Sequence, residues 1–339
     1  LKQSYEVASQ LVVEQKHIVA FIVCCFDIRI LSGLIGGIEI NQIAVFVFVD
    51  LHKGAEVCIN LRPQDIQTTI KEVRPTVMCS VPRFWEKVYA GVQEKIAHET
   101  GVVKAMMLDA IKVGKEHNLN YLRLGKKPPL MLHLKYKFYE RTVYALLKKT
   151  IGIDRGNFFP TAGAAVPDEI CEFVHAVGIK MMVGYGLTES CATVSCFDVE
   201  RFEIGSVGEV LPGLEVKIGE ENEILLRGKS ITRGYYRKQE ATKAAIDAEG
   251  WFHTGDAGYL KGRTLFLTER IKDLFKTSNG KYICPQALES KLGIDRYIDQ
   301  ITIIADQRKF VSALIVPVYP LVEQYAKEKG ITYVSRAEL

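Results

Sequence analysis

The chain has 339 residues, of which 48% are hydrophobic and 25% are charged, which is enough for about two globular domains with sizeable cores. Its formal net charge of +4 is small for this length, and no stripe of basic residues interleaved with aromatic ones occurs. These properties argue against a nucleic-acid-binding protein.

The eight cysteines form no CxxC pair, and Cys58, Cys79 and Cys171 lie inside apolar runs. This pattern argues against a zinc site and favours small core residues in a reducing compartment. The chain opens on mixed polar sequence, and Asp27 and Arg29 interrupt its richest apolar run, so we expect neither a signal peptide nor a transmembrane helix. A cytoplasmic protein is expected, with association at the cytoplasmic face of a membrane as the open alternative.

Residues 1–51 show no clear helix caps, and only the apolar run at 45–49 predicts a buried strand. Pro63 near the start and Pro75 after the end predict a helix over residues 62–74. A short buried strand is expected at 76–81.

An apolar stripe with helical spacing follows this strand. Its members are Phe84, Trp85, Val88, Tyr89, Val92 and Ile96. We interpret the stripe as core packing rather than as a ligand-binding surface. Residues 101–150 are helical in composition and basic, with a break at Lys126-Lys127-Pro128-Pro129. A solvated helix face is the expected reading, and contact with anionic lipid headgroups or a phosphate-bearing substrate is the alternative.

A strand from Asn157, a helix from Pro167 to Gly178 and a strand at 179–183 predict a βαβ unit in a parallel sheet. Gly163-Ala164-Ala165 follows the first strand, and the segment from Gly184 to Ser190 follows the second. Ligands of such sheets lie beyond the carboxyl ends of the strands. Both segments are therefore candidate binding loops.

The second loop carries groups that suit a phosphate and a cation. Thr188 can donate a hydrogen bond to a phosphate oxygen, and Glu189 can bind a hard cation such as Mg²⁺. The same residues also suit an ordinary turn with capping chemistry, and the loop alone does not separate the two interpretations.

After Ser195, glycine and proline punctuate short alternating runs, which predicts a small antiparallel β subdomain. Its expected elements are strands at 214–218, 223–226 and 264–268 and a helix at 238–247. A compact α+β unit is expected from about residue 271. Its expected elements are helices at 285–291 and 321–329 and strands at 300–305 and 311–318.

Six motifs occur in an order and at a spacing typical of one family. They are Gly163-Ala164-Ala165, Tyr185-Gly186-Leu187-Thr188-Glu189, Gly205-x-x-Gly208-Glu209, Arg227-Gly228 with Gly234-Tyr235-Tyr236, Trp251-Phe252-His253-Thr254-Gly255-Asp256, and Arg270-x-Lys272-Asp273-x-x-Lys276. On these motifs the chain resembles the AMP-forming acyl-adenylating enzymes, and most closely the long-chain fatty-acid–CoA ligases. The segments 60–63 and 81–87 add to the long-chain resemblance, which covers about residues 54–339.

The resemblance implies a ligase that uses ATP, Mg²⁺ and coenzyme A. A fatty-acid carboxylate attacks the α-phosphorus of ATP, and the thiol of coenzyme A then attacks the acyl carbon and releases AMP. Two other functions stay open: a nucleotide- or acyl-binding module without catalysis, and a ligase for another acid or for a carrier-protein thiol. The family's phosphate loop, its His-bearing aromatic motif and its C-terminal lysine are not recognisable, so we expect the middle of a longer enzyme that is weakly active or inactive alone.

The resemblance also implies roles for single residues. Gly163 and Ala164 would flank the adenine, and Tyr185 with Gly186 would contact the nucleotide, the Tyr185 ring also lining the acyl channel. The hydroxyl of Thr188 would bind the α-phosphate, and Glu189 would bind Mg²⁺.

In the later motifs, Asp256 would accept both ribose hydroxyls, and Arg270 would brace the ribose or a phosphate. Lys272 matches a hinge position, and Lys276 matches a lysine that some relatives use in the thioester step. Asp256 also fits a simple turn, and the charge run from Arg270 also fits a solvated surface. His253 is expected to pack or to cap.

The predicted fold is α/β, with a layered body around a largely parallel sheet, a small antiparallel β subdomain and a truncated α+β C-terminal domain. The predicted limits are 1–51 for an N-terminal segment, 52–198 for the α/β part of the large domain, 199–271 for the β-rich subdomain, and 272–339 for the start of a mobile C-terminal domain.

Overall fold

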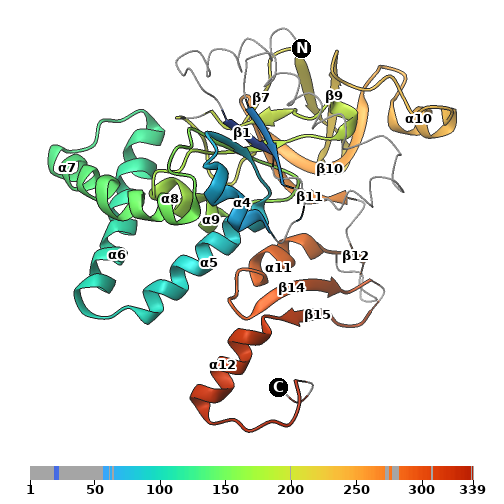
Figure 1. Ribbon diagram of the computed structural model, residues 1–339. Helices are drawn as coiled ribbons and strands as arrows, with labels where there is room; N and C mark the ends of the chain where they lie inside the picture. The colour runs from blue at the N-terminus through green and yellow to red at the C-terminus, as the bar shows by residue number, and fades with distance from the viewer. Residues whose placement is uncertain are drawn as a thin grey trace. The chain divides into compact units, whose positions relative to one another are not determined.

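The computed structural model (Figure 1) describes residues 19–22, 56–60, 62, 65–198, 200–271, 275–276, 282–306, 308–336 and 338. The strand expected at 45–49 lies outside the described residues. The chain divides into two compact units, the first formed by Leu1–Thr254 and Tyr259–Leu267 and the second by Gly255–Gly258 and Thr268–Leu339. The limits expected from the sequence at 51, 198 and 271 stay predictions.

A three-stranded parallel sheet begins the first unit. Its strands β1 (Val19–Ile22), β2 (Glu56–Ile59) and β3 (Val77–Cys79) have the order β2-β1-β3. Helix α4 (Ile66–Val73) lies between β2 and β3 in the chain and is shorter than the helix expected at 62–74. It ends because Arg74 adopts a left-handed conformation with φ of 49°, just before Pro75.

The largest sheet has eight strands. In spatial order they are β4 (Phe159–Thr161), β5 (Met181–Tyr185), β6 (Ser195–Cys196), β7 (Glu209–Val210), β11 (Thr264–Arg270), β10 (Phe252–Lys261), β9 (Glu223–Gly228) and β8 (Leu214–Ile218). Strands β4 and β5 are parallel, whereas β5–β6, β6–β7, β7–β11 and β8–β9 are antiparallel pairs.

The eight-stranded sheet is therefore mixed. Its parallel part, β4 and β5, continues the parallel pairing of β1 to β3 through the bridges Val77–Phe158 and Ser80–Thr161, and its antiparallel part starts at β6. The expectation of a largely parallel body sheet beside an antiparallel β subdomain is thus confirmed in part. Parallel neighbours need a crossover of about a dozen residues or more, and α9 (Asp168–Ala176) provides one between β4 and β5. The short connection 219–222 between β8 and β9 permits only an antiparallel pair. The βαβ unit and the antiparallel strands at 214–218 and 223–226 are confirmed.

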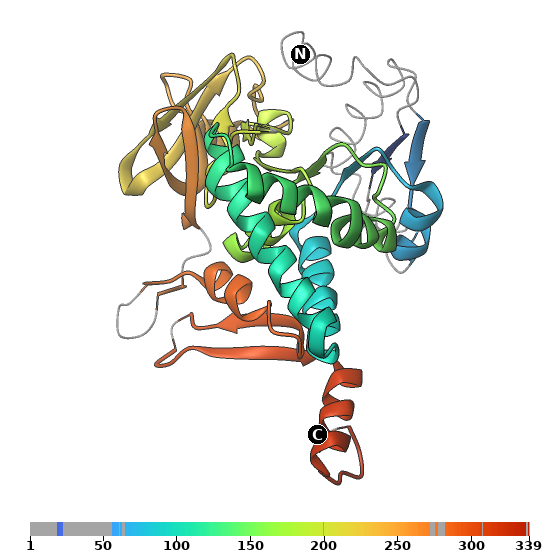
Figure 2. The same ribbon diagram turned by 90° about the vertical axis from the view of Figure 1, so that its left-hand side faces the viewer.

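Helices fill the chain between β3 and β4. They are α5 (Pro82–His98), α6 (Gly101–Gly114), α7 (Leu130–Tyr139) and α8 (Ala145–Ile151), with π-helical turns at Lys115–Tyr121 and Glu140–Tyr144 and a 3₁₀ turn at Leu122–Leu124. Figure 2 shows these helices in cyan and green. The break expected at 126–129 separates the 3₁₀ turn from α7.

The apolar stripe of α5 packs into the core, as expected. Trp85 is fully buried and Ile96 is 5% exposed, while Phe84 and Tyr89 are partly buried and pack against the same cluster. The Trp85 ring contacts the rings of Phe84 and Phe159 edge to face, with centroids 5.0 and 5.5 Å away. The buried members of the stripe, Trp85 and Ile96, are therefore not available to a ligand.

The rest of the β-rich region contains α10 (Gln239–Ala245). The second unit contains a hairpin of β14 (Ile298–Ile304) and β15 (Ser312–Pro317), with the helices α11 (Pro285–Leu292) and α12 (Tyr319–Lys329). Strands β12 (Phe275–Lys276) and β13 (Tyr282–Ile283) form a separate antiparallel pair. Each helix and strand expected after residue 284 is present within a few residues of its expected bounds.

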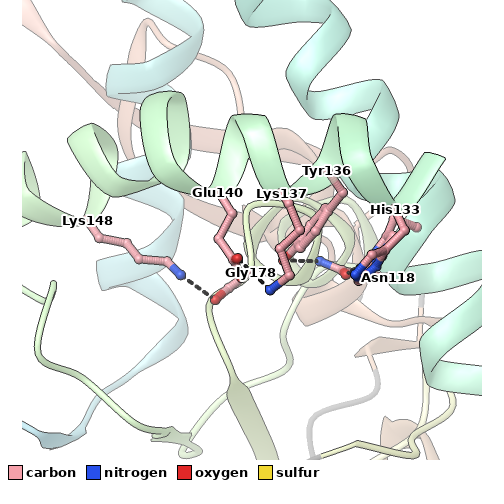
Figure 3. Close-up of polar contacts among 8 residues, drawn as sticks. Asn118, His133, Tyr136, Lys137, Glu140, Lys148 and Gly178 are labelled. Atoms are coloured by element: carbon pink, nitrogen blue, oxygen red, sulfur yellow. Dashed lines mark hydrogen bonds and ion pairs between the residues drawn. The ribbon is translucent and has the colours of Figure 1, made fainter. Parts of the chain in front are cut away.

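A polar network joins α7, α8 and the π-helical turn at Lys115–Tyr121 to α9 and to Gly178 beyond its end (Figure 3). His117 is 1% exposed and stacks on the ring of Tyr136 at 3.9 Å. Its Nδ1 lies 2.8 Å from Oδ1 of Asn118, and its Nε2 lies 3.0 Å from Nδ1 of His133. The Asn118 amide nitrogen donates to the carbonyl oxygen of His175 at 2.8 Å, so Oδ1 of Asn118 accepts. His117 therefore donates through Nδ1 to Oδ1 of Asn118. In the neutral imidazole that burial favours, its Nε2 accepts from Nδ1 of His133.

Burial opposes charge at three groups around this network. It lowers the pKa of His117 and also the pKa of Lys148, whose Nζ donates to the carbonyl oxygen of Gly178 at 2.6 Å (Figure 3). His175 is 7% exposed, stacks on Phe202 at 4.0 Å, and has no hydrogen-bond partner for Nε2 within the described part of the chain. Burial lowers the pKa of His175 to about 3.

These depressed histidine pKa values predict acid lability of the fold. The unfolded His175 takes up a proton near its ordinary pKa of about 6.5, whereas the folded one resists until about pH 3. Stability is therefore full above pH 6.5 and falls as the pH drops below it, with His117 acting in the same direction. From pH 7 to pH 5, His175 alone should lower the free energy of unfolding by about 2 kcal/mol.

Urea unfolding of His175→Phe at these two pH values tests this expectation. Phe keeps a ring against Phe202 and cannot titrate, so the loss of stability on acidification should be smaller than in the unsubstituted chain. The same change at the exposed His98 is the matched control. An unchanged pH dependence in His175→Phe would contradict the expectation.

Candidate functional site

The two candidate loops follow neighbouring parallel strands. Strands β4 and β5 pair with Thr161 opposite Val183, so Gly163-Ala164 and the loop from Gly186 leave the same edge of the sheet. Gly163 is exposed, has φ of 94°, and a Cβ added there would meet no atom within 4 Å. The open space at Gly163 and the exposure of Ala164 leave room for a flat ring, and their predicted contact with an adenine stays a prediction.

A buried hydrogen-bonded triangle fixes the end of β4. The indole nitrogen of Trp85 donates to the hydroxyl oxygens of Ser80 and Thr161 at 2.9 and 3.0 Å, and these two oxygens lie 3.0 Å apart. All three residues are buried. No role for Ser80 or Thr161 was predicted from the sequence, although a buried indole usually has a polar partner for its N–H.

Gly186 allows the loop after β5 to fold back on itself. A Cβ at this position would lie 1.5 Å from the carbonyl oxygen of Ala192, so no side chain fits. The backbone nitrogen of Val194 donates to the carbonyl oxygen of Tyr185 at 2.8 Å and closes the loop. Cys191 and Ala192 adopt positive φ values of 53° and 84°, which are sparsely populated for non-glycine residues and often accompany functional sites.

Ser190 fixes the inside of the same loop. It is fully buried, and its hydroxyl accepts from the backbone nitrogen of Leu187 at 2.9 Å and donates to the carbonyl oxygen of Leu187 at 2.8 Å. Thr188 to Ser190 form a short 3₁₀ turn. Tyr185 precedes this turn and is 8% exposed, because its ring packs in the core with Val194. It therefore offers little surface to a ligand.

Thr188 and Glu189 lie side by side on this turn, and both are partly exposed. The Tyr235 hydroxyl donates to Oε1 of Glu189 at 2.9 Å, and the backbone nitrogen of Thr232 donates to the carbonyl oxygen of Glu189 at 2.6 Å. Burial and the Glu189 carboxylate raise the pKa of Tyr235 to about 12, which keeps this hydroxyl protonated as a donor. Among the described residues, the Thr188 hydroxyl and Oε2 of Glu189 have no hydrogen-bond partner.

Sequence reasoning placed Tyr235 in a family motif but gave it no role. The position that fixes Glu189 is 46 residues away in the chain, so only the folded structure joins them. His253 has a structural role, as expected. Its Nδ1 lies 2.8 Å from Oε2 of Glu223, and its Nε2 lies 3.9 Å from Oδ2 of Asp247.

The predicted ribose group belongs to the second unit. Asp256 in β10 is 9% exposed, and its Oδ1 lies 3.5 Å from Nε of Arg270, the last residue of β11. The structure thus brings these two residues together as an ion pair. Lys272 lies outside the described residues, and for Lys276 the structure describes only its place in strand β12.

A cation at Glu189 would need ligands beyond the neighbouring side chains. No group of three or more His, Cys, Asp or Glu residues that could hold a metal ion occurs in the described ranges. Mg²⁺ is commonly bound by one or two carboxylates together with substrate phosphates and waters. A single carboxylate oxygen without a partner, next to a free hydroxyl, fits that mode of binding.

Within the described ranges of the chain, no helix is both long and apolar enough to cross a membrane.

Curated relatives with known names match most of the chain. A long-chain-fatty-acid–CoA ligase of Bos taurus is 32% identical over 274 residues, which cover 77% of this chain and 37% of the relative. A peroxisomal long-chain acyl-CoA synthetase of Arabidopsis thaliana is 30% identical over 279 residues, covering 77% and 38%. A putative fatty-acid–CoA ligase of Mycobacterium tuberculosis is 29% identical over 285 residues, covering 82% and 49%. The chain thus spans less than half the length of these relatives.

Solved structures share the fold at lower identity. The adenylation domain of a carboxylate reductase from Mycobacterium chelonae superposes with a TM-score of 0.59 at 19% identity, covering 81% of this chain and 40% of that one. The O-succinylbenzoate coenzyme A synthetase of Bacillus subtilis, in complex with ATP and magnesium ion, gives a TM-score of 0.55 at 19% identity, covering 98% and 58%. These superpositions establish the adenylation fold.

The sequence model of the AMP-binding enzymes matches residues 40–236, which is more than half of the chain. The chain therefore belongs to the AMP-binding enzyme family.

Proposed function

We propose that the protein containing this chain activates a long-chain fatty acid with ATP and transfers the acyl group to coenzyme A. The observation that carries the proposal is the pair of free groups on the loop after β5. The Thr188 hydroxyl and Oε2 of Glu189 are adjacent, partly exposed and without partners among the described residues. Such a pair suits a phosphate oxygen and a divalent cation.

In this proposal Thr188 donates a hydrogen bond to the α-phosphate, and Glu189 binds Mg²⁺ through Oε2. When bound, the cation offsets the negative charge that develops on the leaving pyrophosphate. Tyr235 orients the carboxylate by donating to Oε1, and Ser190 holds the backbone of the turn. These hydrogen bonds hold the Glu189 carboxylate and the backbone of the turn in place, and a preorganised charge stabilises a transition state better than a mobile one.

The remaining residues of the proposal bind the nucleoside part of ATP. Gly163 and Ala164 flank the adenine, and Tyr185 and Gly186 contribute mainly backbone beside the nucleotide, because the Tyr185 ring is buried. Asp256 accepts the ribose hydroxyls, and Arg270 holds the Asp256 carboxylate in place and braces the ribose or a phosphate.

Coenzyme A transfer is the less direct part of the proposal. In this part, Lys276 acts in the thioester step, and Lys272 is a hinge at the start of a mobile domain covering 272–339. Both roles rest on the sequence motif from Arg270 to Lys276. The long-chain acid is supported by the printed names of the fatty-acid–CoA ligases that match this chain. An aryl or short-chain acid, or a carrier-protein thiol, is the competing substrate choice.

ATP–pyrophosphate exchange by the full-length protein tests the reaction and its substrate together. Palmitate should support exchange, and a series of fatty acids should compete more strongly as the chain lengthens. Benzoate and acetate serve as the comparison acids. Absence of exchange with every acid, while ATP still binds, would leave a nucleotide-binding module without catalysis.

Glu189→Gln should lower the exchange rate of the full-length enzyme by about 10²-fold, because a preorganised charge at the phosphates is lost. Gln keeps an oxygen that accepts from Tyr235, so the loop should stay folded. The Mg²⁺ concentration for half-maximal exchange should rise as well. Glu240→Gln, at a carboxylate that is 90% exposed, is the matched control. Wild-type exchange in Glu189→Gln would remove Glu189 from the site.

Tyr235→Phe should weaken the same step by about fivefold, since one hydrogen bond to a charged group is lost while the carboxylate remains. The adjacent Tyr236→Phe, at a side chain that is 84% exposed, should leave exchange unchanged. The Mg²⁺ requirement separates a positioning role from a merely structural one. Tyr235 has no positioning role if Tyr235→Phe slows exchange without altering that requirement.

A further inference from the structure

The outer face of α7 exposes large apolar side chains. Leu130, Leu134 and Phe138 recur every fourth residue and are 72%, 55% and 56% exposed, and Met131 beside them is 77% exposed. The opposite side of the helix carries Tyr136 and Tyr139, which are buried in the core. We call Leu130, Met131, Leu134 and Phe138 the α7 face. Single exposed apolar residues are ordinary, but an apolar row on one helix indicates a contact surface.

The segment around the α7 face is strongly basic. Residues 121–150 contain eight Lys and Arg and one Glu, a formal charge of +7, although the whole chain carries only +4. The Glu140 carboxylate pairs with Lys137 at 2.6 Å. Four exposed cations of the segment form no ion pair within the described part of the chain: Lys126, Lys127, Arg141 and Lys149. Lys126 and Lys127 directly precede α7.

We propose that the α7 face docks on an anionic lipid surface. A helix that lies in a membrane interface combines an exposed apolar row with flanking Lys and Arg, which meet the negative headgroups while the apolar groups enter the acyl boundary. Hydrogen bonds hold the inner side of α7, where His133 contacts His117 and Tyr136 accepts from Asn118 (Figure 3). The outer side of the helix is thereby kept facing away from the core. The proposal does not depend on the proposed ligase activity.

The charge also decides between a lipid surface and a second copy of the chain. In a symmetric dimer through the α7 face, two segments of charge +7 would oppose each other, and like charges across an interface are unfavourable. A surface of phosphatidylserine supplies the opposite sign along the whole face. The docked state would thus lie on the membrane rather than cross it.

Vesicle flotation of the 339-residue chain tests the proposal. The chain should bind vesicles of phosphatidylcholine with about 30% phosphatidylserine and release them as salt rises, and it should bind pure phosphatidylcholine at least tenfold more weakly. The double variant Leu134→Gln with Phe138→Gln should bind at least tenfold more weakly than the unsubstituted chain. Its matched control is Leu314→Gln with Phe310→Gln, where one Leu and one Phe are 65% and 68% exposed in the second unit. The control should bind normally.

The cations have their own pair of variants. Lys126→Gln with Lys127→Gln should weaken binding to the anionic vesicles, whereas the same two changes at the exposed Lys327 and Lys329 of α12 should not. Circular dichroism melting checks that each variant is folded. Equal weakening by both lysine pairs would mean that only the overall charge matters, and this result would overturn docking through α7.

A local reporter keeps the proposal testable if a double variant does not fold. Leu130→Trp places an indole on the α7 face, while Trp85 and Trp251 are buried. Its emission should shift to the blue and be quenched by brominated lipids in anionic vesicles, and Leu314→Trp should show neither change. Four results would overturn the proposal: no vesicle binding, binding that the α7 variants leave intact, a dimer that the α7 variants abolish, or a full-length protein in which Leu130→Trp is already shielded without lipid.

Discussion

The parallel pairing of β4 with β5 is the constraint on which both candidate loops depend. It places Thr161 opposite Val183, so Gly163 and Gly186 leave the sheet at the same edge. The same strand β4 is tied to β3, since the backbone nitrogen of Ser80 donates to the carbonyl oxygen of Pro160 at 2.8 Å. Strand β5 in turn begins the antiparallel series with β6. One βαβ crossover therefore links the parallel and antiparallel parts of the first unit and fixes the site between two loops.

Most elements of this fold follow from local sequence signals. Pro82 at the start of α5, the stripe that includes Trp85, and Pro285 at the start of α11 mark helices that the structure contains. The union of the parallel and antiparallel parts in one eight-stranded sheet was not predictable in this way. The apolar run before Gly184 looks the same in a parallel or an antiparallel neighbourhood, and only the partner strands, distant in sequence, decide between them.

The candidate site also has a part that the sequence predicts and a part that only the folded structure brings together. Thr188, Glu189 and Asp256 stand in recognisable motifs, so sequence alone could propose them. The hydroxyl that orients Glu189 belongs to Tyr235, 46 residues away, and the indole that fixes the end of β4 at Thr161 belongs to Trp85, 76 residues away. No local sequence pattern predicts such contacts, because a tyrosine or a tryptophan among apolar residues is first interpreted as a core residue. The lowered pKa of His117 was equally hidden, since it arises from burial in the folded chain and from the neighbouring His133.

The contact between Gly186 and the carbonyl oxygen of Ala192 has a consequence for how such a site can diversify. It is a backbone contact, and so this constraint on the path of the loop does not involve the side chain of Thr188 and adds to the hydrogen bond between Tyr235 and Glu189. Those two positions can therefore exchange one chemical group for another while the loop keeps its course. In this loop the backbone contact at Gly186 sets the geometry, and the side chains at the two neighbouring positions carry the chemistry.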